Sequence, residues 1–83
     1  MAKNKKNKIE QFVINKVKEI RIDKGLSQED IASILNTSRG FIGQIESLNY
    51  SAHYNLDHLN TLAIELQVSP KDFLPEKPIK ETD

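Results

Sequence analysis

The sequence predicts an all-α fold in which five short helices form one compact domain. Apolar residues recur at spacings of three and four along most of the chain, which is the periodicity of amphipathic helices. Polar residues that favour helix starts and ends divide this pattern into five segments. No segment alternates apolar and polar residues for long enough to predict a strand. With 83 residues, the chain has the length of one domain with a small core.

The first helix is predicted from Ile9 to about Asp23, because one apolar stripe runs along this segment. That stripe contains Ile9, Phe12, Val13, Val17 and Ile20. Gly25 then favours a left-handed C-terminal cap. Residues 1–8, MAKNKKNK, lack apolar periodicity and are predicted to form a basic, flexible N-terminal arm.

The second helix is predicted at Gln28–Leu35. Ser27 and Asp30 form the Ser-x-x-Asp pattern of a capping box at its start. The residues expected to face the core are Ile31, Ala32 and Leu35. Asn36 adopts positive φ at modest cost, so it can end the helix where glycine is more usual.

The third helix is predicted from Arg39 to about Ser47. Ser38 is its expected N-cap, and Thr37 is the competing candidate. The residues expected to face the core are Ile42 and Ile45. A break of only three residues between the second and third helices favours a pair that crosses steeply over a long antiparallel hairpin.

The fourth helix is predicted at Leu56–Gln67, with Asn55 as its cap. Its apolar stripe contains Leu56, Leu59, Leu62, Ala63 and Leu66. Residues 69–72, SPKD, then place serine at a cap, proline at the first helical position and aspartate at the third. This start signal predicts a short fifth helix that carries Phe73 and Leu74.

The chain is therefore expected to contain the arm at residues 1–8, a domain at residues 9–75 and a polar, flexible tail at residues 76–83. The formal net charge is zero, but residues 1–24 carry eight Lys or Arg against three Asp or Glu. The rest of the chain is net acidic. The basic start either contacts a polyanion or only adds solubility.

The composition argues against several classes of protein. The absence of cysteine excludes disulfides and thiolate zinc sites. No apolar run suits a membrane span or a signal peptide, so a cytoplasmic protein without membrane contact is expected. His53 and His58, five residues apart, do not share a helix face, so no metal site is expected. No phosphate-binding glycine loop or nucleophile–base pattern indicates an enzyme, and no cofactor is expected.

The run GLSQEDIASILNTSRGFIGQIE, followed after a loop by LDHLNTLAIELQVSPKDFL, resembles the Cro and lambda-repressor family of regulators, also called the XRE family. The resemblance covers about residues 9–75. It implies a lambda-repressor-like domain with a helix-turn-helix at the second and third helices. It also implies sequence-specific binding of double-stranded DNA by a transcriptional regulator, most simply a repressor, with the third helix in the major groove.

Carried over from the family position by position, the base-facing places are occupied by Arg39, Gly40, Gly43 and Gln44. Their chemistry agrees with that role. The guanidinium of Arg39 matches the N7 and O6 acceptors of guanine, and the amide of Gln44 matches N6 and N7 of adenine. The resemblance also places Arg21 and Glu46 as a structural ion pair between the first and third helices.

Phosphate contacts are expected at helix starts, where unpaired backbone amides meet the positive end of the helix dipole. The resemblance places Gln28 there, and Ser38 begins the third helix. The loop after Glu46, SLNYSAHYN, has no Lys or Arg, so its contacts must come from neutral donors. The candidates are Asn49, Tyr50, Ser51, His53 and Tyr54, of which Asn49 and Tyr50 are expected to contact phosphate. Because the loop has no basic residue, the arm can supply the phosphate neutralisation through Lys3, Lys5, Lys6 and Lys8. The contacts expected among these are Lys5 and Lys6.

Several alternatives stay open at the level of sequence. Gly43 allows close approach of DNA or packs beside another helix. Phe41 covers the edge of the core or touches a thymine methyl group. Tyr50 and Tyr54 contact phosphate or pack the loop onto the fourth helix.

The expected partners are a DNA operator and a second copy of the chain, bound as a homodimer. The residues considered for the dimer surface are Phe73, Leu74 and Ile79. The alternative function is a protein-binding adaptor or an antitoxin subunit, whose C-terminal region binds another protein.

Overall fold

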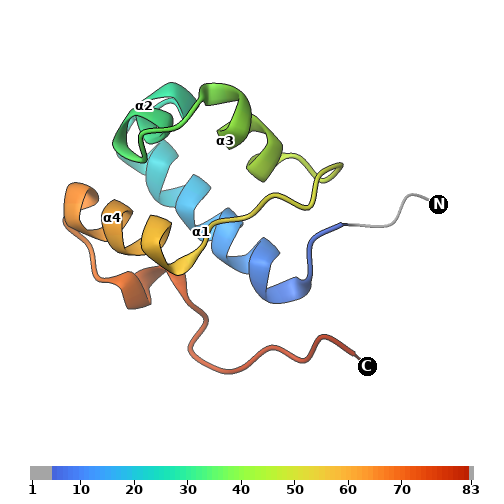
Figure 1. Cartoon of the computed structure of the whole chain (residues 1–83). Helices are drawn as coiled ribbons and strands as arrows, with labels where there is room; N and C mark the ends of the chain where they lie inside the picture. The colour runs from blue at the N-terminus through green and yellow to red at the C-terminus, as the bar shows by residue number, and fades with distance from the viewer. Residues whose placement is uncertain (1–4, 83) are drawn as a thin grey trace.

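The structure, a computed structural model, describes residues 5–82. It contains four α-helices, α1 (Lys8–Asp23), α2 (Gln28–Ile34), α3 (Arg39–Glu46) and α4 (Leu56–Leu66), followed by the 3₁₀ helix η1 (Pro70–Phe73). Figure 1 shows α1 crossing the middle of the molecule, with α2 and α3 on one side of it and α4 on the other. The described residues form no strand, so the all-α prediction is confirmed.

Local capping chemistry fixes most of the helix boundaries. The predicted caps Ser27, Ser38 and Asn55 each accept a hydrogen bond from the backbone N–H three residues later. Gly25 and Asn36 both take the left-handed conformation, with φ of 71° and 55°. The turn between α2 and α3 therefore forms as the sequence predicts.

The predicted fifth α-helix is wrong in type, because residues 70–73 form the single 3₁₀ turn η1. Ser69 and Asp72 make the predicted capping box, but the chain leaves helical geometry at Leu74, which is extended with ψ 151°. The start signal is common to both helix types, and a segment this short favours the tighter 3₁₀ turn. The helix α4 also ends one residue early, because Gln67 adopts a left-handed φ of 57°.

One core joins all five elements. Its fully buried large side chains are Phe73, Ile14, Ile31, Ile42, Ile45, Leu62 and Val17. The face of α1 is turned from the predicted stripe, since Ile14 is 1% exposed while Phe12 is only half-buried. Leu56, the first residue of the predicted stripe of the fourth helix, is 79% exposed at the start of α4.

Both chain ends make contacts that the sequence did not predict. Asn7 caps α1 in a capping box with Glu10. The carboxylate of Glu81 accepts hydrogen bonds from the backbone N–H groups of Lys8 and Ile9, at 2.7 and 3.1 Å. Residues 1–4 of the predicted arm lie outside the described residues. The division into arm, domain and tail stays a prediction.

Candidate nucleic-acid interface

The turn between α2 and α3 is closed by backbone hydrogen bonds. The N–H of Thr37 donates to the carbonyl of Ala32 at 2.9 Å, and the N–H of Asn36 donates to the carbonyl of Ser33 at 3.2 Å. These bonds satisfy carbonyls at the end of α2 while the chain reverses at Asn36. Ser38 then starts α3, because its hydroxyl oxygen accepts the Phe41 N–H at 3.1 Å.

The helix α3 has one buried side and one exposed side. Ile42 and Ile45 are both 0% exposed. Of the predicted base-facing residues, Arg39, Gly40 and Gln44 are exposed, and Gly43 is half-buried. The exposed side of α3 is therefore available to a partner, while its apolar side fixes the helix to the core.

A largely buried ion pair connects α3 to α1. The guanidinium of Arg21 on α1 contacts both carboxylate oxygens of Glu46 at 3.1 Å. Their side chains are 12% and 5% exposed, respectively. Arg21 also donates to the carbonyl of Leu26, and the amide of Gln28 donates to Glu46 at 3.0 Å. This network, which the resemblance anticipated in part, connects α1, the start of α2 and the end of α3.

Gly43 lies beside α2, but there is room for a larger residue at this position. A Cβ added at Gly43 would meet the side-chain oxygen of Gln28 at 3.8 Å, which is an ordinary contact. Gly40 is equally open, with the hydroxyl of Ser38 at 3.9 Å. Packing within the chain therefore does not explain why glycine stands at either position.

Gly43→Ala is expected to stabilise the domain by about 1 kcal/mol, because glycine inside a helix lowers its stability by that amount relative to alanine. The same change is expected to weaken DNA binding if the helix backbone approaches the bases closely. Urea unfolding and a DNA titration measure the two effects on one protein. Gly40→Ala, in the first turn, is the matched variant with a smaller expected gain in stability. A loss of stability in Gly43→Ala would contradict the space that the structure shows.

The starts of α2 and α3 lie on either side of an open surface hollow. Its lining residues are Arg21, Ser27, Gln28, Glu29 and Arg39. Because the first turn of a helix leaves N–H groups without intrahelical partners, such a position suits an anion. Gln28 is held by Glu46, while Ser38 is exposed but uses its oxygen as a cap. The phosphate contacts of both residues stay predictions.

The two tyrosines in the loop between α3 and α4 differ in burial. Tyr54 is 6% exposed and belongs to the core, whereas Tyr50 is 48% exposed. Burial raises the pKa of Tyr54, the charge of Glu46 raises it further, and Arg21 opposes them. Asn49 is exposed, and its N–H donates to the hydroxyl of Ser47 at 3.2 Å. Of the two tyrosines, only Tyr50 is placed for contact with a partner, and Phe41 packs at the edge of the core.

The two lysines predicted to contact phosphate have different environments. Lys5 is exposed. Lys6 is 5% exposed, and its ammonium donates to backbone carbonyls at the end of α3, so the assignment of Lys6 to phosphate needs correction. Burial lowers the pKa of Lys6, and the charge of Glu10 opposes that shift. The sequence pattern did not reveal this contact, because it joins residues 38 to 44 positions apart.

Each of the two histidines contacts another residue of the chain. His58 accepts the backbone N–H of Asn55 at 3.0 Å in the capping box of α4. His53 lies 3.3 Å from the carboxylate of Glu10. Within residues 5–82, no three His, Cys, Asp or Glu side chains gather as a metal site requires.

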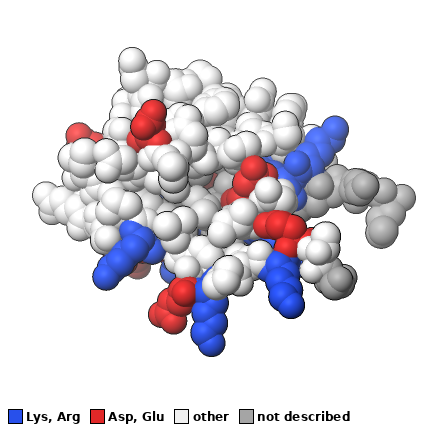
Figure 2. Space-filling model, turned by 60° about the horizontal axis from the view of Figure 1, so that its bottom comes forward, with Lys and Arg blue, Asp and Glu red and all other residues white. Residues whose placement is uncertain are grey.

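Charge is mixed on the face of the molecule that Figure 2 shows. Basic and acidic side chains lie interspersed there, and the described residues form no continuous basic surface on this face. Phosphate-binding faces are expected to concentrate positive charge.

None of the described helices is long and apolar enough to cross a lipid bilayer.

Comparison with known proteins gives matches to both the sequence and the fold. The sequence pattern of the family described as HTH_3, Helix-turn-helix, matches residues 17–73. A hypothetical transcription factor, NHTF from Neisseria, has a similar fold, with a TM-score of 0.66, 21% sequence identity, and coverage of 81% of this chain and 75% of that chain. No curated protein matches the sequence significantly.

Two further solved structures are more similar in sequence. The restriction-modification controller protein C.AhdI from Aeromonas hydrophila has a TM-score of 0.62 and 28% identity, over 78% of this chain and 94% of that chain. An HTH_3 family transcriptional regulator from Vibrio cholerae has a TM-score of 0.63 and 28% identity over 78% of this chain. This chain spans 35% of the Vibrio protein.

Proposed function

We propose that this chain, which belongs to the helix-turn-helix family HTH_3, is a transcriptional regulator that binds double-stranded DNA in a sequence-specific manner. The observation that supports this most strongly is the exposed side of α3. It presents Arg39 and Gln44, while Ile42 and Ile45 hold the opposite side in the core. The family and the two similar regulators are consistent with this function.

In the proposed complex, α3 lies in the major groove and α2 crosses the phosphate backbone above it. Arg39, Gly40, Gly43 and Gln44 face the bases. The contacts to the DNA phosphates come from Gln28, Ser38, Asn49, Tyr50 and Lys5. The fixed connection between α3 and α1 through Glu46 supports a rigid presentation of the helix, which reduces the ordering that binding requires.

We further propose that the protein acts as a repressor and binds a two-fold operator as a homodimer, with half-sites about 34 Å apart. Leu74 is 44% exposed and Ile79 is half-buried, so both are candidates for the dimer surface. Phe73 is withdrawn from that surface because it is 0% exposed. Analytical ultracentrifugation with and without operator DNA tests the dimer.

Arg39→Ala and Gln44→Ala are each expected to lose about 1–3 kcal/mol of discrimination between the preferred base and other bases. Selection of bound sites from a random DNA pool first identifies the operator. Fluorescence titration of single-base operator variants then measures discrimination. Each substitution is expected to relax a different position of the site. An unchanged base preference in both variants would contradict the proposed placement of α3.

The alternative, a protein-binding adaptor or antitoxin subunit, is an outcome of the same experiment. The selection is carried out at physiological salt, because phosphate contacts alone give weak and salt-sensitive binding. Recovery of one site with two-fold symmetry supports the regulator. A pool that shows no enrichment, together with stoichiometric co-purification of another protein, supports the adaptor.

A further inference from the structure

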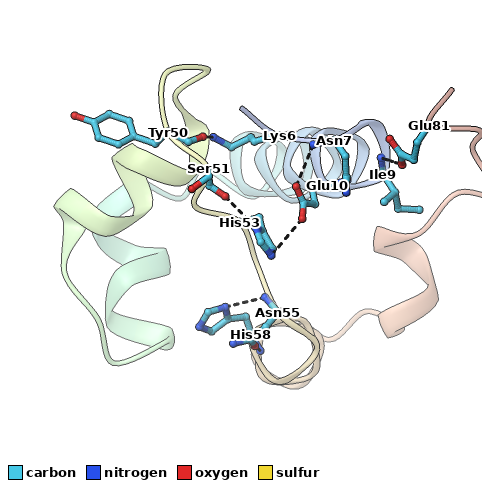
Figure 3. Close-up of polar contacts among 10 residues, drawn as sticks. All are labelled: Lys6, Asn7, Ile9, Glu10, Tyr50, Ser51, His53, Asn55, His58 and Glu81. Atoms are coloured by element: carbon cyan, nitrogen blue, oxygen red, sulfur yellow. Dashed lines mark hydrogen bonds and ion pairs between the residues drawn. The ribbon is translucent and has the colours of Figure 1, made fainter. Parts of the chain in front are cut away.

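The carbonyl end of α3 is occupied by a side chain from the start of the chain. The ammonium of Lys6 donates to the carbonyls of Gln44 and Ser47, at 3.3 and 2.5 Å, and to the carbonyl of Tyr50. Figure 3 shows Lys6 directed at the loop beside Tyr50. One side chain therefore connects the segment before α1 to both the last turn of α3 and the loop that follows it.

This contact supplies positive charge where the last turn of α3 and the loop after it have none. The last turn of α3 contains no basic residue, and residues 47–55 contain no Lys or Arg. The last carbonyls of a helix lack intrahelical partners and carry partial negative charge, so a cation is stabilising there. Hydrogen bonds from an ammonium are also stronger than bonds between neutral groups. In many helices a basic residue of the last turn supplies this positive charge. In α3 it comes instead from Lys6, which lies outside the helix.

A second contact holds the same loop to α1. One carboxylate oxygen of Glu10 accepts the backbone N–H of Asn7, and the other lies 3.3 Å from His53. The ring of His53 in turn lies 2.9 Å from the carbonyl of Ser51. Figure 3 shows these contacts side by side at the start of α1. The loop is thus attached at two points, one on each side of Ser51: to Lys6 before α1 and to Glu10 within α1.

We propose that Lys6 is a positioning residue for DNA binding. It fixes the end of α3 and residues 47–50 in the geometry that the duplex requires, and it does not contact phosphate itself. This inference rests on the proposed function. It is supported by the burial of Lys6, which is 5% exposed, and by the exposure of Asn49 and Tyr50 in the loop that it holds.

Acetylation of the wild-type protein tests where the ammonium lies. Lys6 is expected to react about tenfold more slowly than the exposed Lys18 with an N-hydroxysuccinimide acetate, since reaction requires local opening. Mass spectrometry locates the modified residues with and without operator DNA. The proposal expects protection of Lys6 already in the free protein. Full reactivity in the free protein and protection only by DNA would overturn it and make Lys6 a phosphate contact.

Lys6→Met tests the effect on binding, because it removes the ammonium and keeps most of the side-chain length. If about one molecule in ten retains the ordered loop, the Kd for the selected operator rises about tenfold. The affinity for random DNA is expected to change less, so the specificity ratio falls. Lys6→Arg, which keeps the charge, is expected to recover part of the operator affinity. Lys18→Met, the matched change on the exposed face of α1, is expected to leave both affinities unchanged.

The salt dependence separates positioning from direct contact. The slope of log K against log salt is expected to be the same for Lys6→Met and the wild type, whereas loss of one phosphate contact makes it shallower by about 0.9. A shallower slope, or an unchanged operator affinity, would overturn the proposal. Faster amide hydrogen exchange at Leu48–Tyr50 in Lys6→Met is the expected structural readout. If that variant does not fold, Lys6→Arg replaces it in the same titrations: weaker operator binding with the wild-type slope is expected, and a shallower slope would overturn the proposal.

Failure of the proposed function gives a different result from failure of this inference. A wild-type protein that selects no DNA site refutes the regulator and, with it, the role of Lys6 in DNA binding. Protection of Lys6 in the free protein would still hold in that case. A wild-type protein that selects a site, but whose Lys6 is reactive or whose Lys6→Met variant binds normally, refutes this inference alone.

Discussion

Glu46→Ala is expected to destabilise the domain by about 3–5 kcal/mol, because removing one partner of a buried ion pair leaves the other charge uncompensated. The side chain of Arg21 is only 12% exposed, so water cannot fully replace the lost carboxylate as a partner of its guanidinium. Gln28 loses its hydrogen-bond acceptor in the same variant. Urea unfolding monitored by circular dichroism measures the change in the free energy of unfolding.

The exposed ion pair between Lys16 and Glu19 is the matched control for this prediction. Its atoms are 3.7 Å apart, and the side chains are 35% and 70% exposed. Glu19→Ala is expected to change stability by less than about 1 kcal/mol, as is usual for a solvated pair. The double variant Arg21→Met, Glu46→Leu is expected to recover much of the loss, since apolar residues of similar volume replace buried pairs well. Equal losses in Glu46→Ala and Glu19→Ala would contradict the burial of the first pair.

Phe73→Ala is expected to destabilise the domain by about 3–5 kcal/mol, because it removes a large buried ring and leaves a cavity. Phe73 is 0% exposed on η1, which packs against both α1 and α4. This loss is a large fraction of the total free energy of unfolding of a small domain. Thermal unfolding at several protein concentrations is the measurement.

The concentration series distinguishes a core residue from a residue at a dimer surface. The effect of Phe73→Ala is expected to be the same at every concentration, whereas a lost subunit contact acts through mass action. Lys71→Ala, an exposed change in the same short helix, is expected to stay within about 0.5 kcal/mol of the wild type. A destabilisation by Phe73→Ala that shrinks as the protein is diluted would return Phe73 to the dimer surface.

Most of the helix boundaries were predictable because they depend on neighbours in sequence. Ser27 and Asp30 form their capping box within one turn, and Gly25 and Asn36 reverse the chain through their own backbone preferences. The same reasoning was wrong at Leu56, because periodicity shows which residues share a face but not where neighbouring elements stop covering it. It also did not distinguish the 3₁₀ turn η1 from an α-helix, since both begin with the same signals.

The candidate site was predictable only in part. The residue types on α3 and the ion pair with Arg21 follow from the family resemblance. The contacts of Lys6 and Glu81 join segments that are far apart in the sequence, and no local pattern predicts which carbonyl or amide a distant charge contacts. Asn7 and Glu10 are different, because their capping pattern stands in the sequence and would have placed the start of α1 one residue earlier.

In the proposed complex, the residues of α3 that recognise the target are separate from those that hold the domain together. Arg39, Gly40 and Gln44 are exposed, and residues in such positions usually alter stability by less than about 0.5 kcal/mol when substituted. Gene duplicates of this protein can therefore diverge at these three positions while the scaffold is inherited intact. A laboratory library randomised there would yield mostly folded variants, from which new recognition preferences can be selected.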